Sequence, residues 1–245
     1  MKPGGAELQL GRLGDLCRFG AELELGVPRV QAEAVEVGAP RGKADEESPR
    51  LGWYSRGYLP HRDEVGLIQS LTFRLADSLP QEKLRQLDRE LALEPMPVRD
   101  VERRKRMEGW LDAGLGCCAL AHPRMAETME DALLRFDGER YRLLAWCIMP
   151  NHVHTLIEPS APLPEIVKSW KSFTGRWALP QGAALGFRTP GKSFWMREVW
   201  DRFIRDDTHL RRTIDYIHQN PVKAGLCASP TAWAWSSARF DPAGD

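Results

Sequence analysis

The sequence has few cysteines, and none of them lies in a paired motif. They are odd in number, and no two are spaced as Cys-x-x-Cys. The five cysteines are Cys17, Cys117, Cys118, Cys147 and Cys227. This pattern argues against a disulfide framework and predicts reduced thiols in a cytoplasmic protein.

Long hydrophobic runs and a net charge are also lacking. No apolar stretch approaches the roughly 20 residues that a helix needs to cross a bilayer, so we expect no membrane association. The opening Met-Lys-Pro-Gly-Gly is not followed by an apolar core, so we expect no signal peptide. The 34 Lys and Arg residues balance the 34 Asp and Glu residues. Global charge therefore gives no indication of a nucleic-acid partner, and the local distribution of charge must be considered instead.

The length of 245 residues suits one large domain, or one domain with an appendage. Residues 1–52 mix short apolar patches with many Gly, Pro and charged residues, and residues 41–50 are strongly polar. We expect a mobile amino-terminal arm or linker there, to which we assign no chemistry. The folded domain is expected over residues 53–245.

Hydrophobic periodicity and turn residues predict alternating strands and helices in the folded domain. The expected strands are 65–76, 140–149, 153–158 and 194–204, and the expected helices are 81–94, 99–114, 123–136, 163–178 and 207–219. Without the helical hairpin at about 81–114, this order is the ferredoxin-like split βαβ pattern with an added final helix. We therefore predict an α+β fold, with an antiparallel sheet that carries helices on one face, an inserted helical hairpin and a C-terminal helix.

Turn and capping residues suggest where some of these elements begin and end. Ser78 is expected to cap the helix that begins near Pro80. Residues 180–193 are rich in Gly and Pro and are expected to form a loop. Pro221 and Gly225 are expected to end the last helix.

The stretch around which the chain is organised is 146–158, where His152 and His154 lie in a β-branched, apolar run. Side chains alternate between the faces of a strand, so both imidazoles are expected on the same side. Two neutral imidazoles can hold a divalent cation if a third ligand comes from elsewhere. The pair alone leaves zinc, manganese and magnesium open, and a purely structural role for the two histidines is the alternative.

Tyr216 and Asn220 are four residues apart in an expected helix and therefore share one face of it. The side-chain carbonyl of Asn220 could complete a His, His, Asn ligand set, and Tyr216 could then act as a phenol nucleophile. The alternative, which spacing alone favours, is that Tyr216 packs in the core and Asn220 ends the helix. His218 faces away from Tyr216 and is expected to take no part.

Basic and aromatic residues gather in the second half of the chain. Residues 167–223 hold eleven Lys and Arg but only five Asp and Glu, with eight Trp and Phe interleaved. Cations with aromatic side chains suit single-stranded nucleic acid, through phosphate contacts and base stacking. The candidate DNA-binding residues are Lys168, Lys171, Trp195 and Arg197, together with the cluster Arg103, Arg104, Lys105 and Arg106. The alternative is a solvated face over an aromatic core.

These motifs together resemble a known family. Residues 149–154, Met-Pro-Asn-His-Val-His, resemble the His-hydrophobic-His signature of the HUH single-strand endonucleases. Residues 216–226, from Tyr216 to Leu226, resemble the tyrosine helix of the REP-associated tyrosine transposases. Further similar segments are 56–61, 72–80, 170–174 and 235–237. The resemblance covers residues 53–239 in the family's order and leaves out residues 1–50.

The resemblance implies a ferredoxin-like domain that acts on single-stranded DNA, often at hairpin-forming repeats. It implies that Tyr216 is the nucleophile and that His152, His154 and Asn220 hold a divalent metal, Mg²⁺ or Mn²⁺. The implied reaction passes through a 5′-phosphotyrosine and allows strand transfer. A non-catalytic DNA-binding protein and a metal phosphodiesterase that uses water are the alternatives. A monomer and a homodimer both remain open.

Overall fold

The computed structural model describes residues 52–55, 60–64 and 66–240. The expected amino-terminal arm lies outside these residues, except for Gly52, which starts the first strand. Residues 56–59 of the motif at 56–61 also lie outside the described residues. None of the helices within the described ranges is both long and apolar enough to cross a membrane.

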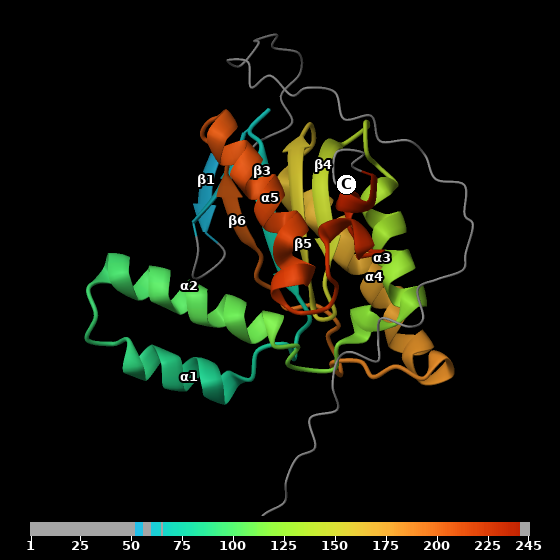
Figure 1. Cartoon of the computed structure of the whole chain (residues 1–245), viewed down its shortest axis with the longest axis horizontal. Coiled ribbons are helices and arrows are strands. Elements are labelled where there is room, and N and C mark those ends of the chain that lie inside the picture. The colour runs from blue at the N-terminus through green and yellow to red at the C-terminus, as the bar shows by residue number, and fades with distance from the viewer. Residues whose placement is uncertain (1–51, 56–59, 65, 241–245) are drawn as a thin grey trace, which may run out of the picture.

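The described residues form strands and helices in the predicted order, preceded by a two-stranded hairpin that we did not predict (Figure 1). The strands are β1 Gly52–Ser55, β2 Pro60–Asp63, β3 Gln69–Arg74, β4 Tyr141–Ile148, β5 His152–Pro159 and β6 Trp200–Phe203. The α-helices are α1 Gln81–Glu90, α2 Met96–Asp112, α3 Pro123–Leu134, α4 Leu163–Leu185 and α5 Asp207–Lys223. Short 3₁₀ turns occupy Ala119–Ala121, Pro230–Ala232 and Ser237–Phe240.

The main sheet has four strands in the order β4-β5-β3-β6, and each neighbouring pair is antiparallel. Its two central strands are the first and third of the split βαβ unit, as in a ferredoxin-like sheet. The α+β fold predicted from the sequence is confirmed. β1 and β2 pair only with each other, as a separate antiparallel ribbon.

The two faces of the sheet are covered by different helices. Phe73 and Val153 point into the larger core cluster, which also contains residues of α3 and α4. Leu156 and Cys147 point to the other face and pack with Ile217 of α5. The predicted helices α3 and α4 thus share one face, while the added final helix α5 crosses the opposite one (Figure 1).

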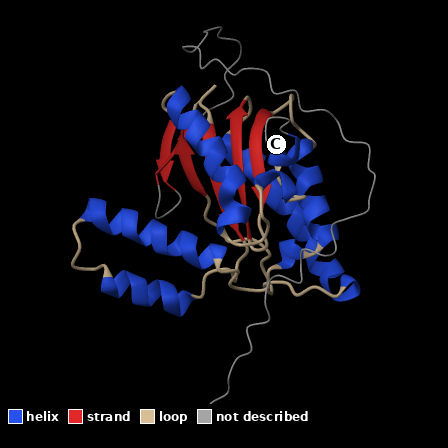
Figure 2. Ribbon diagram, in the orientation of Figure 1, coloured by secondary structure: helices blue, strands red, loops and turns tan. Residues whose placement is uncertain are grey.

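Helices α1 and α2 form the predicted hairpin, which extends away from the sheet (Figure 2). The hairpin has a hydrophobic cluster of its own, made of buried aliphatic side chains with Trp110 and Trp200 packed against it. Its buried members are Leu79, Leu84, Leu87, Leu91, Met107 and Leu111. Because this cluster is separate from the two sheet clusters, the hairpin is a semi-independent unit of packing.

Two helices continue through prolines that we expected to end them. Pro180 lies inside α4, which runs on to Leu185 and ends where Gly186 takes a left-handed conformation. Residues 180–193 are therefore not wholly a loop, because the Gln-Gly-Ala-Ala-Leu segment completes the helix before Gly186 ends it. Pro221 likewise lies inside α5.

Two other expectations about element ends were wrong. Ser78 does not cap α1, because its hydroxyl donates to the carbonyl of Leu75. The strand expected at 194–204 is reduced to β6. Before β6, the chain makes one antiparallel bridge, between Leu75 and Trp195, and the amine of Lys171 donates to the carbonyls of Met196, Arg197 and Glu198.

Candidate active site

His152 and His154 project from the same face of β5, as predicted, while Val153 between them points into the core on the other face. The Nε2 atoms of the two imidazoles are 3.0 Å apart, and the ring planes are nearly perpendicular at 88°. Both side chains are buried, with 1% and 3% of their surface exposed. The strand therefore places one nitrogen of each imidazole close enough together for both to reach a single bound atom.

Asn151 fixes the tautomer of His152. The amide nitrogen of Asn151 donates to the carbonyl of Leu115 at 2.9 Å, which orients the amide. Its oxygen then faces Nδ1 of His152 at 2.7 Å, and because a carbonyl oxygen only accepts, Nδ1 must carry the proton. Nε2 of neutral His152 is left with a lone pair directed at His154.

Thr72 allows two arrangements of His154. It lies directly across from His154 in the β3–β5 ladder, and its hydroxyl is 2.9 Å from Nδ1. If the hydroxyl donates, Nε2 of His154 carries a proton and hydrogen-bonds to His152. If the hydroxyl accepts, both Nε2 lone pairs face one point, which is the arrangement that a cation requires. The paired imidazoles and their outer partners thus fit a divalent metal.

A loop before α3 holds the carbonyl that orients Asn151. Gly116 has φ +91°, and a Cβ there would come within 2.9 Å of the carbonyl oxygen of Asp77. The carboxylate of Asp77 accepts a hydrogen bond from the backbone nitrogen of Cys117 at 2.8 Å. Only glycine fits this close approach, so the position of the Leu115 carbonyl depends on the glycine at 116.

Helix α5 brings Tyr216 against the histidine pair. The rings of Tyr216 and His154 meet edge to face, with their centroids 5.6 Å apart. Asn220 lies one turn further along the helix, is 1% exposed, and donates its amide N–H to the carbonyl of Tyr216 at 2.7 Å. The structure therefore brings the predicted nucleophile and the two predicted imidazole ligands together, with Asn220 buried one helical turn from Tyr216.

His218 lies elsewhere, as expected, and bonds to the hydroxyl of Ser237. Among the described residues, no group of three or more His, Cys, Asp and Glu could hold a metal ion. The amide of Asn220 remains the predicted third ligand.

Burial sets the protonation of the imidazoles. Desolvation lowers the pKa of His154 to about 4, with a smaller effect from the charge of Lys223. Desolvation, followed by the neighbouring His154, lowers the pKa of His152 well below its ordinary value. Both rings are consequently neutral at pH 7, and a neutral ring can offer a lone pair to a metal.

The phenol of Tyr216 is held in its protonated form. Desolvation raises the pKa of Tyr216 most, and the carboxylates of Glu108 and Asp112 on α2 raise it further. The side chain of Asn220 and the charge of Arg202 act in the opposite direction. The amine of Lys223 lies 4.9 Å from the centre of the tyrosine ring. The inserted hairpin therefore contributes charges to the tyrosine site.

Arg74 also belongs to this side of the sheet, and sequence reasoning assigned it no role. It is directly across from His152 in the β3–β5 ladder and is 6% exposed. Its guanidinium donates to the hydroxyl of Ser78 at 3.3 Å. Desolvation, with a contribution from Arg103, lowers its pKa to about 10. The motif at 72–80 contained Thr72 and Arg74, but only the strand register shows which histidine each one faces.

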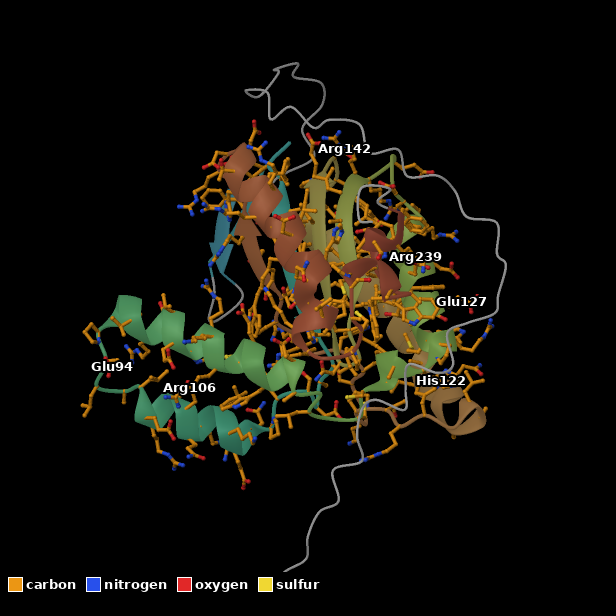
Figure 3. All side chains as sticks on the ribbon, viewed as in Figure 1. Glu94, Arg106, His122, Glu127, Arg142 and Arg239 are labelled. Carbon is orange, nitrogen blue, oxygen red and sulfur yellow. The ribbon has the colours of Figure 1, made fainter. Side chains whose placement is uncertain are left out.

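The basic cluster on α2 divides into paired and unpaired residues. Arg103 forms an ion pair with Asp88 at 2.8 Å. Arg106 lies between the hairpin helices and pairs with Glu90 and Glu102 (Figure 3). The pairs with Asp88 and Glu90 link α2 to α1, whereas the pair with Glu102 lies within α2.

Arg104 and Lys105 are exposed, and no ion pair is formed by either one within the described ranges. The DNA-binding role predicted for the cluster therefore suits these two residues best.

The remaining candidate DNA-binding residues lie in different environments. Lys168 is exposed in a groove between α3 and α4, and Arg197 is exposed in the loop before β6. Lys171 binds the backbone carbonyls of that loop. Trp195 is 6% exposed and donates its indole N–H to Thr174. A buried indole has no open face on which a base can stack, so its position gives no support to the stacking role predicted for Trp195.

A family model described as "Transposase IS200 like" matches residues 122–220, which include both histidines, Tyr216 and Asn220. This segment, 99 of the 245 residues, is similar to the IS200-like transposases. The resemblance seen in the motifs is confirmed at this level.

Relatives of the IS200-like segment carry related names. The chain is 32% identical over 113 residues to a Haemophilus influenzae protein named as a REP-associated tyrosine transposase. That match covers 41% of this chain and only 61% of the relative. An Escherichia coli protein named REP-associated tyrosine transposase is 23% identical over 118 residues, with 48% of this chain and 67% of the relative covered.

Two solved structures are also similar to the chain. One is described as a REP-associated tyrosine transposase bound to a REP hairpin; it is 19% identical, with a TM-score of 0.45, and the match covers 78% of this chain and 91% of that one. The other is a Deinococcus radiodurans transposase at 16% identity, with a TM-score of 0.36 and coverage of 68% and 96%.

Proposed function

We propose that the chain is a single-strand DNA endonuclease and strand transferase that uses Tyr216 as its nucleophile. One observation carries the proposal: the phenol ring of Tyr216 on α5 packs against His154 of β5, whose Nε2 lies 3.0 Å from that of His152. Tyr216 is 62 residues from His154 in the sequence, and such a long-range contact between a phenol and a histidine pair suits a site for group transfer. The similarity of residues 122–220 to the IS200-like transposases supports the same reaction class.

A divalent metal is part of the proposal. His152, His154 and Asn220 would hold the Mg²⁺ or Mn²⁺ that the resemblance implies, through two imidazole nitrogens and one amide oxygen, of which the oxygen is the ligand that these cations prefer. When bound, the metal would supply Lewis-acid polarisation of the scissile phosphate and favour the phenolate form of Tyr216. Asn151 and Thr72 would keep the two rings in the orientation that ligation needs.

The phenol oxygen of Tyr216 attacks phosphorus and forms a new O–P bond. The bond from phosphorus to the 3′ oxygen breaks, the phenol proton passes to solvent, and the 3′ oxygen takes up a proton to become a hydroxyl. The product is a 5′-phosphotyrosine, so the number of phosphoester bonds does not change. A second 3′ hydroxyl can therefore reverse the step and join strands without ATP.

The substrate class that we propose is single-stranded DNA, at repeats that form hairpins. One of the similar solved structures is described as a REP-associated tyrosine transposase bound to a REP hairpin, which is consistent with this choice. The local excess of basic residues over 167–223 supports binding to a phosphate backbone.

Replacing Tyr216 by phenylalanine tests the proposal. We expect the Tyr216→Phe variant to lose both cleavage of hairpin DNA and the covalent protein–DNA adduct on a denaturing gel. Its affinity for the same DNA should stay within about twofold, because the substitution removes one oxygen. Tyr141→Phe is the matched control, since Tyr141 lies in the core on the other face and donates to the Leu133 carbonyl.

The alternatives give different results in the same assay. A non-catalytic DNA-binding protein would bind hairpin DNA but form no adduct even with Tyr216 in place. A phosphodiesterase that uses water would cut DNA without an adduct, and Tyr216→Phe would still cut. Either result would remove Tyr216 from the proposed role.

A further inference from the structure

Arg74 is a buried cation without a counter-charge. It is 6% exposed, and the hydrogen bond that its guanidinium makes is to the hydroxyl of Ser78. The neighbouring charge that acts on it is a second cation, Arg103. Among the described residues, no carboxylate forms an ion pair with Arg74.

The strand register places Arg74 beside the histidine pair. Side chains alternate along β3, with Leu71 and Phe73 in the core under α3 and α4. Thr72 and Arg74 therefore share the other face, where Thr72 meets His154 and Arg74 stands across from His152. Directly opposed residues in antiparallel strands have Cβ atoms about 4.5–5.5 Å apart.

A guanidinium in this position is unfavourable in the free protein. Burial of a charge with no opposite charge beside it is costly, and one neutral hydroxyl offsets little of that cost. The carboxylate of Asp77, three residues along the chain, accepts a hydrogen bond from the backbone of Cys117 and forms no ion pair with Arg74 in the part of the chain that the structure describes. Such a side chain is explained if an anion reaches it when the site is in use.

We propose that Arg74 binds a phosphate of the substrate strand where the strand passes the histidine pair. The planar fork of arginine matches two oxygens of a phosphodiester, which Lys cannot reproduce. The proposal rests on the proposed function, because it assumes that the tyrosine site receives DNA. Its competitor is a structural role, in which Arg74 only ties β3 to the turn at Ser78.

Arg74→Met separates the two roles when it is made in Tyr216→Phe protein, where no cleavage occurs. We expect the dissociation constant for a short fluorescent single strand to rise about tenfold or more. The slope of log affinity against log salt should become shallower by about 0.7, the value for one lost phosphate contact. The free protein should keep or increase its melting temperature, because an unpaired buried charge is removed.

Arg85→Met is the matched control, because Arg85 is an exposed arginine on α1 and the substitution is the same. It should leave affinity, salt slope and melting temperature close to those of the parent. Equal affinity of Arg74→Met and Arg85→Met would overturn the proposal.

Inorganic phosphate gives a second measurement that needs no DNA. We expect phosphate at millimolar concentration, at constant ionic strength, to raise the melting temperature of wild-type protein more than that of Arg74→Met. Arg74→Lys keeps the charge but loses the fork, so its shift should be intermediate. If Arg74→Met does not fold, a full wild-type shift and wild-type DNA affinity in Arg74→Lys would assign Arg74 a structural role.

A failure of the Arg74 proposal can be distinguished from a failure of the proposed function of Tyr216. If Tyr216 were not the nucleophile, wild-type protein would form no adduct, yet Arg74-dependent binding would persist. If Arg74 were only structural, the adduct would still form with wild-type protein, and the binding and phosphate experiments alone would fail.

Discussion

His152 and His154 can serve as metal ligands only while they are neutral, and their burial has a cost at low pH. The pKa of His154 is lowered to about 4 from an ordinary value near 6.5. Between pH 4 and 6.5, His154 is protonated in the unfolded chain but stays neutral in the folded protein. The stability that this histidine contributes is fully present above about pH 6.5 and is lost as the pH falls towards 4.

We therefore predict that the free energy of unfolding decreases by about 3 kcal/mol for His154 alone between pH 6.5 and 4, at 1.36 kcal/mol per pKa unit. Urea unfolding at a series of pH values, with a chelator present, measures the effect. His154→Gln should flatten this dependence. His209→Gln is the control, because His209 is only partly buried and solvent screens the effect that lowers its pKa. Equal flattening in both variants would contradict the role of burial.

The sequence predicts the side chains that define the site but not those that orient them. The His-x-His spacing places His152 and His154 on one face, and the four-residue spacing places Tyr216 and Asn220 on another. Asn151, Thr72 and Arg74 act through a cross-strand register and a distant carbonyl. Neither of these is encoded as a local pattern, so no spacing rule could have found them.

The sequence predicted the inserted helical hairpin best, because both of its helices form where they were expected. Its leucines recur at helical spacing, and they form a cluster separate from both faces of the sheet. A local pattern suffices for such a unit because its core is made mostly of residues close in sequence.

The start of β6 and the end of α4 were harder to predict from local sequence patterns. Lys171, far along the chain, holds the segment that precedes β6, and Gly186 rather than Pro180 ends α4.

The separate cluster predicts that the hairpin can open without the sheet. Leu87 is 1% exposed, so Leu87→Ala should cost about 2–5 kcal/mol within the hairpin. Hydrogen exchange followed by mass spectrometry should show lost protection in α1 and α2, while β3 and β5 keep theirs. Leu93→Ala is the matched control, since Leu93 is 97% exposed at the end of the hairpin. Equal loss of protection in the sheet would show that the hairpin is not a separate unit.

At the scale of the whole molecule, the two faces of the sheet carry different surfaces. The α5 face holds the tyrosine site, whereas the α3–α4 face holds a groove of about 430 Å³. Arg135, Arg140, Lys168 and Arg176 line this groove, with Glu165 as the acidic residue of its lining. Phe173 also lines it and is 43% exposed. Cations around an open aromatic ring suit a phosphate backbone with a stacked base.

Helix α4 aligns two of these cations, because Lys168 and Arg176 are eight residues apart and lie on one side of the helix. We predict that Lys168→Gln combined with Arg176→Gln weakens binding of a long hairpin substrate and makes the salt slope shallower by about 0.7 per lost contact. A short strand that reaches only the tyrosine site should bind as before. Fluorescence titrations at several salt concentrations measure both.

The control for the groove must remove the same charge elsewhere. Arg85→Gln combined with Arg89→Gln does this on exposed positions of α1, which is not part of the groove lining and packs in a separate cluster. If the two double variants lose affinity equally, the effect belongs to total charge and the groove has no special part. A loss confined to the groove variant and to long substrates would mean that DNA crosses from the α5 face to the α3–α4 face. The tyrosine would then act on a strand that the opposite side of the sheet holds in place.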